Sequence, residues 1–166
     1  MNDARHVASI DRFMRRVASP ESWGGERPRQ ERDEEEPSPC FIDAAGHWRP
    51  VRREAELVLP VSGCHASVGP WLGRWWRLCI EGFVADDPIV LSSVSNDREL
   101  SAVVQDLALH RENHPGPVSS APIGSLHDGR WLAIADSGEV VIGGHGEVAR
   151  VAAPDLPSFL RELRLF

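Results

Sequence analysis

The sequence lacks two amino acids altogether. It contains no tyrosine, and all 18 residues counted as Lys+Arg are arginines, so lysine is absent from the 166 residues. Schiff-base chemistry and the P-loop need a lysine, and tyrosine acid–base catalysis needs a phenol. The composition therefore excludes these classes of enzyme.

Positive charge is also in short supply. The 18 arginines face 25 acidic residues, and the net charge is −7. Proteins that bind nucleic acid in general depend on a basic face that neutralises phosphates. We therefore expect no nucleic-acid partner. An acidic surface instead favours a basic protein as the partner, because opposite charges steer two proteins together.

Cysteines are few, and long hydrophobic runs are missing. Cys40, Cys64 and Cys79 are odd in number and have no C-x-x-C spacing, which argues against a disulfide framework and a zinc site. No apolar run approaches the ~20 residues that span a bilayer, and the N-terminal MNDARHVASIDRFMRR holds no signal-peptide core. We expect a cytoplasmic protein with free thiols and no membrane contact.

What is present suits one folded domain. Apolar residues make up 42% of the chain, and 14 glycines bring the total close to the usual globular composition. We predict an N-terminal helix within residues 1–19, an acidic flexible loop or linker over 20–39, and an α+β domain over 40–166. The loop is predicted because residues 20–39 are rich in acids and almost without apolar side chains.

Three helices are predicted from apolar periodicity and capping residues. Apolar residues at helical spacing predict a helix over about 4–18, with Asn2 or Asp3 as its N-cap. Asn96, followed three residues later by a glutamate, begins a helix over about 97–110. Asp155 caps a terminal helix whose first turn holds a proline.

Strands are predicted from runs of β-forming residues bounded by turns. They cover, in chain order, residues 54–61, 74–84, 88–94, 131–135, 139–142 and 147–151. Gly82 suggests a β-bulge in the second of them. Residues 115–122 are predicted to be a loop, and the last three strands form a meander.

Motifs for chemistry are weak. Residues 144–149 fit G-x-G-x-x-A, but no helix of sufficient length can follow, so we expect a turn and no dinucleotide. Residues 63–69 nearly form a nucleophile elbow, but His65 occupies the place of its first glycine. His110 and His114 have the i, i+4 spacing of metal ligands, yet a proline follows directly and no acidic companion is near. We expect no metal and no cofactor.

An aromatic cluster and an acidic pair are the candidate partner-binding residues. Trp75 and Trp76 are adjacent, so on a strand they point to opposite faces and cannot both enter one core face. Two alternatives follow: one of them is exposed, or it packs under the N-terminal helix or the acidic segment. An exposed tryptophan is a common anchor of an interface. Trp71 or Trp75 is the candidate anchor, and Asp86 and Asp87 are the candidate charged rim of the same contact.

The last third of the chain resembles a known family. Its residues are Ala121-Pro122-Ile123-Gly124, His127–Ile134, Gly138-Glu139-Val140 and Ser158–Leu163. This order of a P-I-G segment, an acidic glycine turn, a second strand with G-x-V and a closing S-F-x-x-x-L helix is similar to the SMI1/KNR4 (SUKH) superfamily. The usual middle segment of that superfamily is missing here.

The resemblance implies both a fold and a role. The fold is α+β, with a curved mainly antiparallel sheet flanked by an N-terminal, a middle and a C-terminal helix. The role is that of a non-catalytic bacterial immunity protein, which binds and neutralises a cognate toxin. Two alternatives remain open: a small hydrolase with a Cys–His or Ser–His pair, and a regulatory protein-binding adaptor. The sequence leaves the oligomeric state undetermined.

Overall fold

The computed structural model describes residues 3–32, 35, 37–114 and 119–166. Its helices are α1 (Asp3–Ala18), the short 3-10 helix η1 (Pro20–Trp23), α2 (Val68–Gly73), α3 (Asp97–Asn113) and α4 (Leu156–Glu162). Its strands are β1 (Val51–Arg52), β2 (Trp75–Trp76), β3 (Ile80–Val84), β4 (Asp87–Leu91), β5 (Ser120–Leu126), β6 (Trp131–Ala135), β7 (Val140–Gly143), β8 (Arg150–Ala153) and β9 (Arg164–Leu165).

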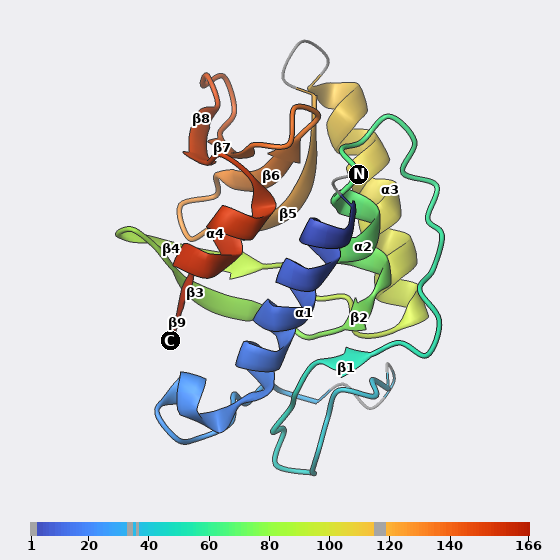
Figure 1. The fold of residues 1–166 in the computed structure, drawn as a ribbon, viewed down its shortest axis with the longest axis vertical. Helices are drawn as coiled ribbons and strands as arrows, with labels where there is room; N and C mark the ends of the chain where they lie inside the picture. The colour runs from blue at the N-terminus through green and yellow to red at the C-terminus, as the bar shows by residue number, and fades with distance from the viewer. Residues whose placement is uncertain (1–2, 33–34, 36, 115–118) are drawn as a thin grey trace.

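One curled antiparallel sheet organises the molecule. Within the described residues its strand order is β8-β7-β6-β5-β4-β3-β9, and β1 and β2 form a separate ribbon. Helices α1 and α4 lie side by side in front of the sheet, and α3 packs against β5 (Figure 1). This arrangement confirms the predicted α+β class, with a curved antiparallel sheet flanked by N-terminal, middle and C-terminal helices.

Helices α1, α3 and α4 form where periodicity and caps predicted them, whereas α2 and η1 were not predicted. In α1, the buried stripe of Ile10, Phe13, Met14 and Val17 lies against the core. Of its two candidate caps, Asn2 lies outside the described residues and Asp3 is the first helical residue.

Both predicted side-chain caps of the other helices are present. The Asn96 side chain accepts a 2.9 Å hydrogen bond from the Glu99 amide at the start of α3. The Asp155 side chain accepts a 2.8 Å bond from the Ser158 amide at the start of α4. Each cap satisfies a backbone donor that the first turn of a helix leaves unpaired.

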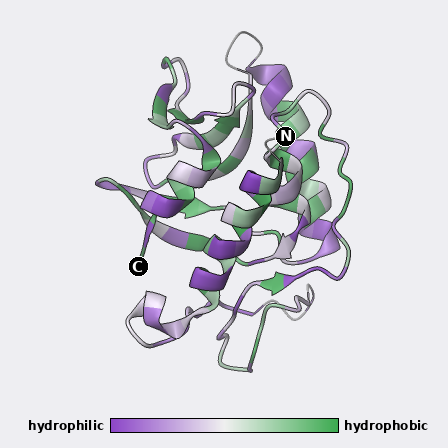
Figure 2. Ribbon diagram, in the orientation of Figure 1, coloured by the Kyte–Doolittle hydropathy of each residue, from purple (hydrophilic) through white to green (hydrophobic). Residues whose placement is uncertain are grey.

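The main core lies between the sheet and the helices. Figure 2 shows hydrophobic residues along the strands, while the side of α1 turned to the viewer is largely hydrophilic. The largest fully buried apolar side chains of this core are Trp48, Trp71, Phe159, Ile10, Met14, Leu72, Ile80, Ile89, Leu91, Ile123 and Leu132.

The strand predictions are correct in part. Predicted strands at 88–94, 131–135 and 139–142 correspond to β4, β6 and β7, and β8 begins at Arg150 rather than at residue 147. The prediction over 54–61 is wrong. That segment is an irregular loop with Val58 fully exposed, because it meets no partner strand and is tied to α2 by the Leu57 amide on the Gly73 carbonyl.

Residues 74–84 form two strands rather than one. The chain leaves β2 after Trp76 and enters β3 at Ile80, and between them Arg77 pairs with Val94. The predicted bulge at Gly82 is absent, since Gly82 pairs in regular register with Ile89 and, on its other side, with Leu165. Glycine is needed at this position because the backbone of β9 lies close to it: a Cβ on Gly82 would lie 2.5 Å from the Arg164 carbonyl oxygen.

The loop predicted over 115–122 contains a strand. Residues 115–118 lie outside the described part of the chain, but β5 begins at Ser120 and occupies the middle of the sheet. Its register shifts between Pro122 and Gly124, so the proline stands at an irregularity of the ladder. This position explains how a central strand accommodates a residue without an amide hydrogen.

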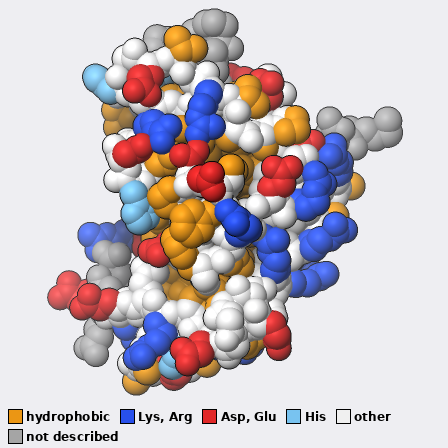
Figure 3. All heavy atoms as spheres, turned by 90° about the vertical axis from the view of Figure 1, so that its left-hand side faces the viewer, with side chains coloured by type: hydrophobic (Ala, Val, Ile, Leu, Met, Phe, Trp, Pro, Cys, Tyr) orange, Lys and Arg blue, Asp and Glu red, His pale blue; other side chains and the backbone are white. Residues whose placement is uncertain are grey.

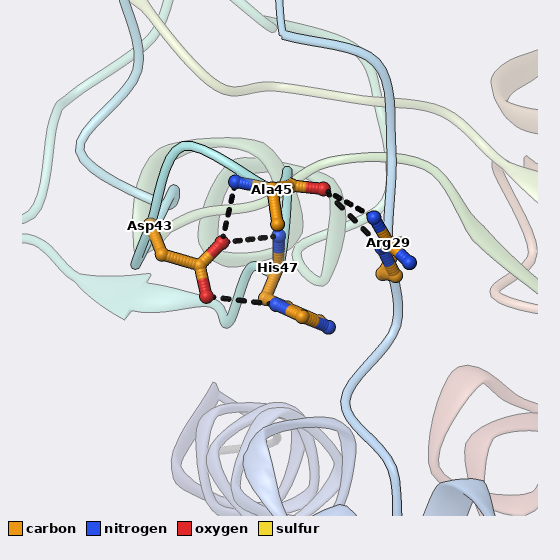
Figure 4. A network of polar contacts seen from close by, with 4 residues as sticks. All are labelled: Arg29, Asp43, Ala45 and His47. Carbon is orange, nitrogen blue, oxygen red and sulfur yellow. Dashed lines mark hydrogen bonds and ion pairs between the residues drawn. The ribbon is translucent and has the colours of Figure 1, made fainter.

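Part of the predicted flexible segment has defined contacts. Trp23 packs partly buried against the core, and its indole donates a 2.8 Å hydrogen bond to the Val17 carbonyl. Arg29 donates two bonds to the Ala45 carbonyl, and the Asp43 carboxylate accepts from the amides of Ala45 and His47 and contacts the His47 ring at 2.7 Å (Figure 4). These bonds hold residues 27–30 against the loop at 43–48.

Candidate functional site

The predicted aromatic anchors are not on the surface. Trp71 is 0% exposed in α2, and Trp75 is 8% exposed at the start of β2. The prediction of an exposed anchor is therefore wrong for both residues. The physical reason is local: the chain turns into α2, so Trp71 packs against Phe13 of α1, and Trp75 uses its indole N–H in a partly buried polar contact.

That contact belongs to a partly buried network centred on Asp11, to which Glu56 is joined through its 2.8 Å contact with Arg74. The Asp11 carboxylate accepts bonds from Arg74 Nε (2.7 Å) and Nη2 (2.8 Å) and from Trp75 Nε1 (2.8 Å). The Arg74 hydrogen bonds lower the pKa of Asp11 to about 2, against burial, and the Trp75 bond acts in the same direction. The network joins α1 to the end of α2 and to β2.

The predicted acidic rim lies on the turn between β3 and β4. Asp86 is exposed there, whereas Asp87 forms ion pairs with Arg150 and, at 3.5 Å, with Arg130. Arg130 also pairs with Asp128 at 2.7 Å. Positively and negatively charged side chains therefore alternate along the rim. Of the two residues predicted for it, Asp86 is the exposed one.

Two further arginines are buried against tryptophans. Arg53 lies 3.4 Å from the centre of the Trp76 ring, and Arg77 lies 4.2 Å from that of Trp71. Arg77 is 0% exposed and donates one bond to the Trp71 carbonyl, and desolvation lowers its pKa to about 9. Such cation–π contacts partly replace the hydration that each guanidinium loses. Trp76, the half-buried member of the cluster, is covered by Arg53.

Among the described residues, the structure brings two serine–histidine pairs together. In one of them the His110 Nε2 lies 3.1 Å from the Ser120 Oγ, and Ser120 is 1% exposed. In the other, the His65 Nδ1 lies 2.9 Å from the Ser67 Oγ, and the ring of His6 meets that of His65 edge to face. Ser67 is 0% exposed, so its hydroxyl meets no substrate in the folded state. The Ser67 amide also donates to His65, which is the geometry of a local turn.

Burial disfavours the ionised form of all three cysteines. Burial raises the pKa of the Cys40 thiol to about 11, and burial likewise raises the pKa values of Cys64 and Cys79. A raised pKa lowers the fraction of thiolate, which is the nucleophilic form. All three are free thiols, as predicted.

The histidine pair at the end of α3 packs against an aromatic ring. His110 and His114 have their ring centres 4.6 Å apart, and both contact Trp131 of β6. Burial, then the neighbouring His114 and Arg111, lower the pKa of His110. Over the described ranges, no group of three or more His, Cys, Asp or Glu side chains is placed to hold a metal ion.

Two other predictions concern a glycine-rich segment and the crossing of a membrane. The G-x-G-x-x-A segment at 144–149 is a turn between β7 and β8, as predicted. In the part of the chain that the structure describes, no helix combines the length and the apolar character that crossing a membrane requires.

A basic groove between α1 and α4 was not anticipated. Its cavity has a volume of about 270 Å³, with an apolar floor that includes Phe13, Pro157 and Leu160. Its cationic lining consists of Arg5, Arg12, Arg16 and Arg161. None of the described residues that line it is acidic. We call this feature the arginine groove.

Each of these arginines is held differently. Arg16 donates from Nη2 to the carbonyls of Leu160 and Leu163, at 2.9 and 2.7 Å, and desolvation lowers its pKa. Arg5 pairs with Asp155 at 3.0 Å, and its side chain is 62% exposed. Arg161 reaches the Ser158 hydroxyl at 3.3 Å. Arg12 is exposed and has no ion-pair partner within the described residues.

The groove has a sequence signal that was overlooked. Arg5, Arg12 and Arg16 follow one another at spacings of seven and four residues, which places them along one face of α1. Arginines on the polar side of an amphipathic helix are usually solvated, so the stripe alone indicates no site. Only the fold brings Arg161 of α4 to it.

No family model matches the chain, and no curated protein matches it in sequence.

Proposed function

We propose that the protein is a non-catalytic bacterial immunity protein, which binds a cognate toxin and blocks it. The observation that supports this proposal is the curled antiparallel sheet closed by α4, because it agrees with the fold that the SMI1/KNR4 resemblance implies. The quoted segments of that resemblance fall on or next to β5, β6 and β7, which are adjacent strands, and on α4, which packs against α1 and β8.

The charge of the molecule supports a basic toxin as the partner. The net charge of −7 attracts a basic protein over a distance of roughly 8–10 Å at physiological salt. With Trp71 and Trp75 buried, the contact has no exposed tryptophan anchor from this pair, and Asp86 is the remaining exposed candidate of the predicted rim.

The proposal is tested by protection of a host cell. Cells that express the toxin encoded by the neighbouring reading frame should grow when they also express this protein. Because binding needs no nucleophile or base, the Cys64→Ala, His65→Ala and His145→Ala variants should protect within about twofold of wild type. Thermal melting of each purified variant checks that it is folded.

Two results would overturn the proposal. One is a wild-type protein that gives no protection. The other is a variant of Cys64, His65 or His145 that melts like wild type and binds the toxin as tightly as wild type but protects at least tenfold less, since that combination would require a chemical step.

A further inference from the structure

The arginine groove is a concentration of positive charge on an acidic protein. Four arginines line one cavity of a chain whose net charge is −7. Figure 3 shows blue side chains gathered along its right-hand edge, the side on which α1 lies. Asp155 offsets the charge of Arg5, and no acidic residue of the described lining offsets the other three.

The arginines of the groove repel one another, and hydrogen bonds to the backbone hold one of them in place. Arg16 is fixed by two carbonyls of the α4 end, and its Nε is buried without a hydrogen-bond partner among the described residues. Like charges at such spacing repel one another, so the groove is electrostatically unfavourable when empty. An anionic ligand would relieve the repulsion and gain charge-assisted hydrogen bonds.

The dimensions of the groove favour an extended acidic peptide over an enclosed small-molecule anion. Helical rise places Arg5 and Arg16 about 16 Å apart along α1, and Arg12 and Arg16 about 6 Å apart. Alternate residues of an extended peptide are about 6.8 Å apart, so two successive carboxylates on one side of such a peptide match the axial spacing of Arg12 and Arg16. The cavity of about 270 Å³ is smaller than the roughly 300–1,000 Å³ of sites that enclose a drug-sized ligand.

The apolar floor of the arginine groove sets a second requirement for the ligand. Phe13, Pro157 and Leu160 give the groove an apolar base beneath the guanidinium groups. A free phosphate or another small hydrophilic anion makes no use of such a base. A short acidic peptide that also carries an apolar side chain on the side facing the groove meets both requirements.

From this geometry we infer that the arginine groove is a docking site for an acidic segment of a partner protein, in which carboxylates pair with Arg12, Arg16 and Arg161 and an apolar side chain enters between α1 and α4. This site is distinct from the acidic rim at Asp86. It does not depend on the immunity role, and its partner chemistry is opposite to that of a basic toxin.

The test measures peptide affinity by fluorescence anisotropy. The probe is a labelled hexapeptide with glutamates and a leucine at alternate positions, so that they lie on one side of the extended chain, and the control probe replaces each glutamate by glutamine. The Arg12→Glu/Arg161→Glu variant should bind the acidic probe at least about tenfold more weakly, and raising the ionic strength should weaken wild-type binding. The glutamine probe should bind wild type at least tenfold more weakly than the acidic probe.

A matched variant and a milder one keep the test decisive. Arg15 is exposed on the same helix but does not line the groove, so Arg15→Glu should leave affinity within about twofold. Arg12→Gln/Arg161→Gln removes the charges without adding acids, and an intermediate loss is expected. Circular dichroism melts confirm that each variant is folded.

Other occupants would contradict the inference. Equal weakening by Arg15→Glu, or equal binding of the glutamine probe, would show that no specific charge pairing occurs. Inorganic phosphate that binds more tightly than the acidic probe would make this a small-anion site. A wild-type dimer that Arg12→Glu/Arg161→Glu dissociates would make the occupant a second copy of the chain.

Discussion

Gly124→Ala is expected to cost about 3 kcal/mol of folding free energy, because a side chain at this position meets backbone. A Cβ on Gly124 would lie 2.3 Å from the Val90 carbonyl oxygen and 3.1 Å from the Leu91 Cα. Both atoms belong to β4, which pairs with β5 in the middle of the sheet. A flexible side chain could move aside, but a paired strand cannot.

Urea denaturation of wild type and variant measures this loss. Gly69→Ala is the matched control, since a Cβ there meets only the Val61 side chain at 3.8 Å and Gly69 lies within α2. Alanine favours helix over glycine, so the control should be neutral or stabilised by up to about 1 kcal/mol. A Gly124→Ala protein as stable as wild type would show that the β4–β5 approach is looser than described.

Asp11→Ala is expected to cost about 3 kcal/mol, which is a large part of the 5–15 kcal/mol that typically stabilises a domain. The change leaves the Trp75 indole N–H and two donors of Arg74 without their acceptor, in side chains that are largely buried. Asp106→Ala, an exposed position on α3, should change stability by less than about 0.5 kcal/mol.

The same network predicts an acid-dependent loss. The pKa of Asp11 falls from 3.8 to about 2 on folding, so its ionised form stabilises the native state above pH 4 by about 2 kcal/mol. This stability is lost as the pH falls from about 4 to 2. The difference in stability between wild type and Asp11→Asn should therefore narrow over that window. A difference that stays constant down to pH 2 would contradict the assigned role of Asp11.

Local signals predicted α1, α3 and α4 but neither α2 nor η1. The α1 stripe, the Asn96 cap and the Asp155 cap depend on residues close together in the chain, and the structure confirms them. The strands were harder, because a strand needs a partner that its own sequence does not name. Residues 54–61 have strand composition without a partner, whereas β5 contains a proline and a glycine and is nonetheless central.

The sites depended even more on contacts that are distant in sequence. Asp11 meets Arg74 and Trp75 across more than 60 residues, and this contact removes Trp75 from the surface where it was predicted. Arg16 reaches the carbonyls of α4 across more than 140 residues. The hydrophobic periodicity of these segments does not indicate which distant residues they contact. The Asp11 network and the arginine groove could therefore be identified only from the fold.

The proposal that the protein acts by binding is tested most directly by titrating the toxin's activity with the purified protein. A binding protein removes activity in proportion to the amount added and abolishes it near one equivalent, and the effect is immediate and independent of incubation time. We expect that result for wild type. Complete loss of toxin activity at a small fraction of an equivalent, progressing with time, would show turnover and would contradict the account.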